Sequence, residues 1–73
     1  MTTDEARKFQ FQVLELVREY NGTGAGYDEL AKCLINIASI MAVHADIKLA
    51  ESMKIFETLY NEALVETPPL LKN

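Results

Sequence analysis

Cys33 and His44 are the two side chains whose types could provide a nucleophile and its base. A thiol is activated when a basic group comes within about 3 Å of its sulfur. The two residues are 11 positions apart in a segment that we predict to be one helix, and this spacing separates them by about 16 Å along the helix axis. We therefore predict no catalytic residue and no enzyme activity in one chain. The alternative is an enzyme with an inter-subunit site, in which Cys33 of one copy meets His44 of another.

The same two residues limit metal and disulfide chemistry. The chain has one cysteine and one histidine, which cannot supply the four ligands of a structural zinc ion. A single cysteine also excludes an intrachain disulfide and favours a reducing compartment. We therefore expect no metal, no cofactor and a cytoplasmic location. Cys33 is then a small buried apolar residue, and His44 lies near the negative end of its helix.

The three glycines of the chain, Gly22, Gly24 and Gly26, alternate with other residues as in some phosphate-binding loops. Those loops follow a strand and carry a longer motif, with a lysine in the case of the P-loop. Here a predicted helix precedes the glycines and no lysine follows in register. We interpret the segment as an interhelical linker, in which Gly22 takes the left-handed conformation that ends the preceding helix.

The net charge of −4 argues against binding to nucleic acid, because such binding needs Lys and Arg to displace counterions from phosphates. An acidic chain suits a basic protein partner better. A small transcription-associated regulator that touches DNA stays open as an alternative. Its recognition helix would be the last one, where Lys48 and Lys54 lie among glutamates that would be repelled by phosphate. Retention on DNA that depends on salt would support that alternative.

Helical patterns cover most of the chain, and we predict an all-α fold with helices at about 3–20, 27–45 and 47–66. Thr2 and Glu5 have the spacing of a capping box. No Gly or Pro occurs between residues 27 and 67, but a single helical register there would place Lys48 within the apolar face. Asp46 is a good N-cap for a new helix. We therefore predict two helices with a break at 46, and one bent continuous helix is the alternative.

These helices predict a single domain over residues 1–67, folded as a small antiparallel three-helix bundle. Pro68 and Pro69 end the last helix, so we expect residues 68–73 to form an extended or disordered tail. The longest apolar run covers residues 33–43, whereas a membrane span needs about 20 residues. The polar start of the chain does not resemble a signal peptide. We expect no association with a membrane.

The predicted helix 27–45 carries more apolar surface than the other two. Its apolar residues spread over roughly 220° of its circumference at 100° per residue, whereas an ordinary surface helix has an apolar stripe of about 100°. In one interpretation, the two neighbouring helices cover this surface and complete a minimal core. In the other, part of the surface packs against a second chain, together with apolar residues that lie off the main stripes of the other helices.

We favour the second interpretation and predict a protein–protein interaction module that self-associates, with a homodimer as the simplest form. Such a module would act as a small regulator or inhibitor by binding another protein. Phage and plasmid regulators of this size offer an analogy only at the level of the class. The residues that we assign to the partner or dimer interface are Phe11, Leu14, Cys33, Ile37, Ile40, Met41, His44, Ile47 and Ile55.

Overall fold

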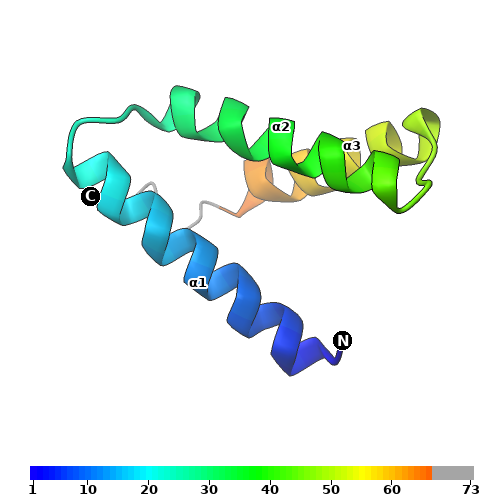
Figure 1. The fold of residues 1–73 in the computed structure, drawn as a ribbon, viewed down its shortest axis with the longest axis horizontal. Coiled ribbons are helices and arrows are strands. Elements are labelled where there is room, and N and C mark those ends of the chain that lie inside the picture. Colours follow the sequence, from blue (N-terminus) through cyan, green and yellow to red (C-terminus); the bar gives the residue numbers. More distant parts are fainter. Residues whose placement is uncertain (67–73) are drawn as a thin grey trace. The chain divides into compact units, whose positions relative to one another are not determined.

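The computed structural model describes residues 1–66, and in this range it is all-helical with three helices and no strand. Helix α1 covers Thr3–Gly22, α2 covers Tyr27–His44 and α3 covers Leu49–Val65 (Figure 1). The predicted all-α class with three helices is therefore confirmed. The predicted tail at 68–73 lies outside the described residues. The bundle packing and the single domain over 1–67 stay predictions.

The chain divides into two compact units, and the boundary lies inside α2. The first unit is Met1–Lys32, which holds α1, the loop after it and the start of α2. The second unit begins at Cys33 and holds the rest of α2 and α3. Each unit is described separately below.

The first turn of α1 has the predicted capping box. The hydroxyl of Thr2 accepts from the backbone N–H of Glu5 at 3.1 Å, and the Thr2 N–H donates to the Glu5 carboxylate at 2.8 Å. The backbone bond from Thr2, followed by the hydroxyl bond, lowers the pKa of Glu5. Two of the N–H groups that a helix start leaves without partners are satisfied in this way.

The end of α1 differs from the prediction by two residues, since the helix continues through Gly22 instead of ending at 20. The prediction that Gly22 is the left-handed residue is wrong, because Gly24 has that role with a φ of +109°. The N–H of Ala25 donates to the Tyr20 carbonyl at 3.2 Å, and the N–H of Gly24 donates to the Asn21 carbonyl at 3.1 Å. This pair of bonds is the Schellman motif, which requires its left-handed residue after the helix has ended.

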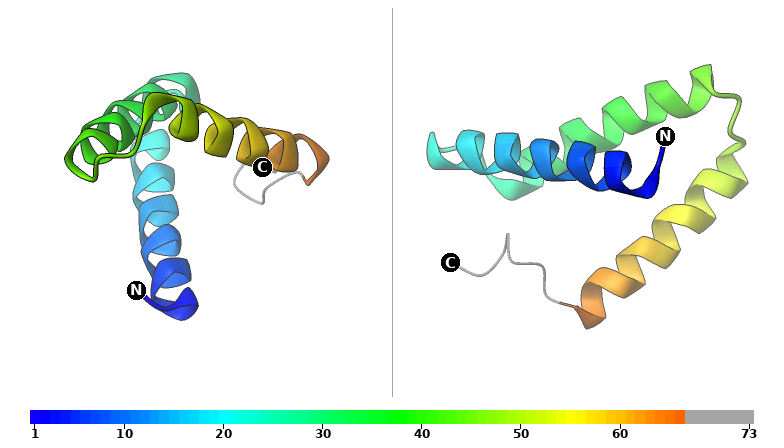
Figure 2. Two further views of the ribbon diagram at one scale, coloured as in Figure 1. Left: turned by 90° about the vertical axis from the view of Figure 1, so that its right-hand side faces the viewer. Right: turned by 90° about the horizontal axis from the view of Figure 1, so that it is seen from below.

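The predicted break between the second and third helices is confirmed, and a four-residue turn at 45–48 separates α2 from α3 (Figure 2). Asp46 has a φ of 57°. Around it the N–H of Ile47 donates to the Ala42 carbonyl at 2.9 Å, and the N–H of Asp46 donates to the Val43 carbonyl at 3.2 Å. The end of α2 is thus a second Schellman motif.

Asp46 ends α2 and does not begin α3, so its predicted role as an N-cap is wrong. The N-cap of α3 is Lys48, which makes no side-chain cap hydrogen bond, and the helix starts at Leu49 instead of 47. The Asp46 carboxylate instead pairs with the Lys48 ammonium at 3.2 Å. An aspartate in the left-handed conformation has a backbone geometry that an N-cap, which is extended, cannot share.

Burial within the described residues is slight. Val17 on α1 is the one buried residue, at 7% exposure, and Ala6 and Val13 on the same stripe of α1 are half-buried. Neither α2 nor α3 contains a buried residue. Cys33 is exposed, so the expectation that it is buried is wrong. A chain of this size has little surface with which to cover its own apolar side chains.

No helix within residues 1–66 is both long enough and apolar enough to cross a bilayer.

Candidate protein interaction surface

The residues at the two ends of α2 match the helix dipole. Asp28 and Glu29 lie in its first turn and His44 in its last, as the helix dipole favours. The hydroxyl of Ser39, on the narrow polar strip, donates to the Ile35 carbonyl at 2.8 Å. That hydroxyl is therefore satisfied within the helix, and the rest of the circumference is left to apolar side chains.

Large apolar side chains of α2 are exposed to solvent in the single chain. Their exposed fractions lie between 40% and 78%, for Leu34, Ile35, Ile37, Ile40, Met41 and Val43. Leu34, Ile37 and Met41 are three or four residues apart and so lie on one side of the helix. Single exposed apolar residues are ordinary on protein surfaces, but a continuous group of them marks an interaction surface.

Every residue that the sequence assigned to an interface is exposed. Five of them, Cys33, Ile37, Ile40, Met41 and His44, lie together on the part of α2 that belongs to the second unit. Ile47 lies in the turn after α2 and Ile55 lies on α3, in the same unit. The remaining two, Phe11 and Leu14, lie on α1 in the first unit.

Some exposed apolar residues were not assigned to the interface from the sequence. Leu34 belongs to the same side of α2 as Ile37, and the spacing of three residues between them is a signal that could have identified it. On α3, Phe56 and Tyr60 are both more than half exposed, and their rings lie 5.9 Å apart. Phe56 and Tyr60 are four residues apart and so lie on one face of α3, and the contact between their rings agrees with that placement.

The geometry keeps Cys33 and His44 apart within one chain. Cys33 and His44 lie on the same helix, as predicted, and their spacing of 11 positions separates them by about 16 Å along its axis. Residues 1–66 contain no group of three or more His, Cys, Asp or Glu side chains that could hold a metal ion. No buried polar side-chain atom in this range lacks a partner.

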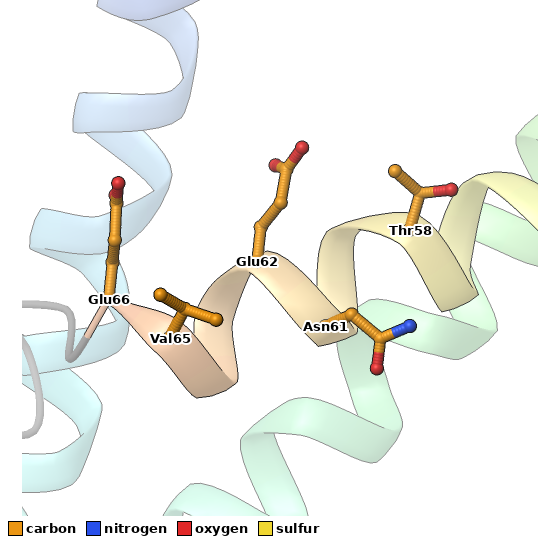
Figure 3. A pocket seen from close by; sticks show the side chains of 5 residues that line it. All are labelled: Thr58, Asn61, Glu62, Val65 and Glu66. Carbon is orange, nitrogen blue, oxygen red and sulfur yellow. The ribbon is translucent and has the colours of Figure 1, made fainter.

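A shallow hollow lies along the last turns of α3 (Figure 3). Its lining residues are Thr58, Asn61, Glu62, Val65 and Glu66. The side chains of Thr58, Glu62 and Glu66 extend to the same side, one turn apart (Figure 3), and the Thr58 hydroxyl already donates to the Lys54 carbonyl at 3.0 Å. Two exposed carboxylates on one helix face make no acid–base pair, so the hollow adds no chemistry to the α2 surface.

The α2 surface is the strongest candidate for a functional site in residues 1–66, because it joins exposed apolar area with a regular helical spacing. No family model, curated protein or solved structure matches this chain.

Proposed function

We propose that the protein is a non-enzymatic helical interaction module that self-associates through α2 and acts as a small regulator or inhibitor by binding another protein. One observation carries this proposal: α2 is apolar around most of its circumference, and none of its residues is buried in the single chain. A helix of this kind is stable in water when another surface covers it.

The size of the exposed surface decides how strong self-association can be. Full burial of a Leu, Ile or Met side chain contributes about 1.5–3 kcal/mol, so a half-exposed one still contributes about 1 kcal/mol. Leu34, Ile37 and Met41 from each of two copies, with Ile40 beside them, then contribute several kcal/mol. Association costs about 4–15 kcal/mol in lost freedom of motion. We therefore expect a weak dimer that dissociates on dilution.

Light scattering across a concentration series tests self-association directly. We expect a mass near twice the 8.2 kDa of the single chain at high micromolar concentration, falling toward 8.2 kDa on dilution. The substitution Ile37→Glu places a charge in the centre of the exposed surface. It should abolish the dimer, because a carboxylate in an apolar interface loses its hydration without gaining a partner.

Ser39→Glu is the matched control, since it adds the same charge to the polar strip of the same helix. This variant should keep the wild-type mass at every concentration, and circular dichroism should show that both variants keep their helices. A wild-type chain that stays at 8.2 kDa at high micromolar concentration would refute self-association. Equal loss of the dimer in both variants would show that charge on the chain matters and the α2 surface does not.

The excess of acidic residues in the chain indicates which kind of protein the proposed regulator would bind. The chain carries 11 acidic and 7 basic residues, and acidic surfaces attract basic ones over distances that salt shortens. We therefore propose a basic protein as the target, in the reducing cytoplasm that an unpaired cysteine favours. Binding to such a target should weaken as salt is raised, whereas apolar self-association through α2 should not.

A further inference from the structure

Asn21 and Gly22 are the last two residues of α1, and an asparagine followed by a glycine loses its side-chain amide more readily than other asparagines. The backbone nitrogen of the next residue attacks the amide carbon, and glycine shields that nitrogen least because it has no Cβ. The space where a Cβ of Gly22 would stand is open. Asn36 and Asn61 precede an isoleucine and a glutamate instead. Among the asparagines of residues 1–66, Asn21 therefore has the most reactive neighbour.

We propose that Asn21 is a site of spontaneous deamidation, and that the turn at 23–26, which we call the α1–α2 turn, controls its rate. In the reaction the nitrogen of Gly22 bonds to Cγ of Asn21, and the bond from Cγ to Nδ2 breaks. Nδ2 leaves as ammonia, with the proton of the Gly22 N–H, and a cyclic succinimide remains. Water then opens the ring at Cγ, which gives aspartate, or at the backbone carbonyl carbon, which gives isoaspartate. Water is the only co-reactant, and self-association has no part in the step.

The folded α1–α2 turn holds Asn21 away from the geometry of this reaction. Its Nδ2 donates to the Ala25 carbonyl at 2.9 Å, and the side chain is half-buried. Its backbone carbonyl accepts from the Gly24 N–H at 3.1 Å. Gly22 belongs to α1, and the N–H of a helical residue is directed at the carbonyl four residues before it. Attack needs a rotation about the Cα–C bond of Asn21 that moves the Gly22 nitrogen toward Cγ, so these bonds must open first.

Deamidation changes a donor into an acceptor across the α1–α2 turn. The amide of Asn21 donates to the Ala25 carbonyl, whereas a carboxylate only accepts, so two facing oxygens replace the hydrogen bond of 2.9 Å. The new charge lies at the negative end of the α1 dipole, where no basic residue of the last turn balances it. Isoaspartate also adds a carbon atom to the backbone. Each product therefore weakens the turn, and the loss of ammonia makes the change permanent.

The rates of deamidation in the folded and the unfolded chain test the control by the turn. The wild-type chain is incubated at mildly alkaline pH in buffer and in concentrated urea, and peptide mapping by mass spectrometry follows each asparagine. We expect Asn21 to convert at least about tenfold more slowly in buffer, which corresponds to an opening free energy of about 1.4 kcal/mol. In urea Asn21 should convert faster than Asn36 and Asn61, because there the neighbouring residue sets the rate.

Three variants separate the chemistry from the turn. Gly22→Ala shields the nitrogen with a methyl group, so it should slow the conversion of Asn21 in urea several-fold. Gly24→Ala strains the left-handed residue at φ +109°, which favours the open turn by a factor of about 5–30. It should speed conversion in buffer by up to that factor and leave the rate in urea unchanged. Thr23→Ala removes the hydroxyl bond to the Tyr20 carbonyl at 2.8 Å and is the milder variant in case Gly24→Ala unfolds the chain.

The effect of the product is tested with Asn21→Asp, which places the carboxylate in the turn from the start. Asn36→Asp is the matched control, since it makes the same change at an exposed position in the middle of α2. Urea unfolding at one fixed protein concentration should give a lower midpoint for Asn21→Asp than for Asn36→Asp. Equal midpoints would show that the product leaves the turn intact and would overturn its proposed effect.

The outcomes test the site and its control by the turn separately. Equal rates of conversion in buffer and in urea would overturn the control by the turn, as would a rate in buffer that neither Gly24→Ala nor Thr23→Ala raises. Conversion of Asn36 or Asn61 as fast as that of Asn21 in urea would overturn the choice of site. Slow conversion of Asn21 in buffer, raised by urea and by either turn variant, supports both parts of the proposal.

Discussion

The two turns that connect the helices use the same backbone motif with different support. After α1, the bond from the Ala25 N–H to the Tyr20 carbonyl closes the motif, and after α2 the bond from Ile47 to Ala42 has the same role. The left-handed position is Gly24 in the first turn and Asp46 in the second. Glycine adopts this conformation without steric cost, whereas the Cβ of any other L-residue makes it unfavourable.

Several side-chain hydrogen bonds support the first turn, whereas a single side-chain contact supports the second. The Asn21 amide donates to the Ala25 carbonyl at 2.9 Å, the Thr23 hydroxyl donates to the Tyr20 carbonyl at 2.8 Å, and the Glu29 carboxylate accepts from Gly26 at 3.2 Å. The second turn has one side-chain contact, the ion pair of Lys48 with Asp46, and both side chains are about four-fifths exposed or more. Such a pair contributes little.

This difference shows that the same Schellman motif can form with strong support from nearby side chains in one turn and with little such support in another. The first turn is supported by residue types chosen at three positions. The second turn holds a non-glycine residue at positive φ, Asp46, whose side chain is exposed to solvent. The second turn therefore has less local support from side chains than the first.

The largest effect is expected from Gly24→Ala. The position has open space for a Cβ, so no clash is added. The φ of +109° is nevertheless strained for any side chain, and such strain costs about 1–2 kcal/mol. Chemical unfolding followed by circular dichroism should show this loss, at one fixed protein concentration because association changes apparent stability. Gly22→Ala, inside α1, is the control and should be neutral or stabilising.

Asp46→Gly should change stability in the opposite direction. Glycine removes the cost of the left-handed conformation, and we expect a gain of about 0.5–1 kcal/mol after the loss of the exposed ion pair. Asp46→Ala loses the same ion pair and keeps the strain, so it separates the two effects and should destabilise. If both variants unfold at the same denaturant concentration, the conformation of residue 46 carries no strain and the contrast between the two turns fails.

Lys48→Ser should add the cap that α3 lacks. Serine at an N-cap accepts a hydrogen bond from the first turn of the helix and contributes about 0.5–1 kcal/mol over residues that cannot. Unfolding experiments should show this gain, with Lys48→Ala as the control that removes the ion pair without adding a cap. An unchanged stability in the serine variant would mean that the first turn of α3 is already satisfied by water.

The sequence predicted the helices well where a local signal exists. The capping box of Thr2 and Glu5, the glycine loop and the division into two helices near residue 46 were all found from residue types and spacing. The signals failed at the helix ends. Asp46 is favoured both as an N-cap and in the left-handed conformation, and residue type alone does not decide between these roles.

The candidate surface could be predicted only in part, and the reason differs from the one at the helix ends. Helical spacing identifies which residues of α2 share a side, but it does not say whether a neighbour covers them. The sequence therefore left two interpretations of α2 open, and Cys33 was expected both to be buried and to belong to the interface. Exposure of Cys33, Ile37 and Met41 in the single chain is a tertiary property, and it depends on the small total surface that 73 residues can offer.

The smallest expected effect concerns the two helix starts, since α1 has a capping box and α3 has none. The bonds from Thr2 lower the pKa of Glu5 in the folded chain. The capping box therefore contributes its stability at pH values above the ordinary pKa of a glutamate, and loses it as the pH falls through the lowered pKa.

An NMR titration of the Glu5 carboxyl carbon should show the low pKa, and Thr2→Ala should raise it partway by removing the hydroxyl. Glu5→Gln keeps the cap uncharged, so the first turn of α1 in that variant should stay helical as the pH falls. Equal loss of helix in Glu5→Gln and wild type would assign the acid response to other carboxylates.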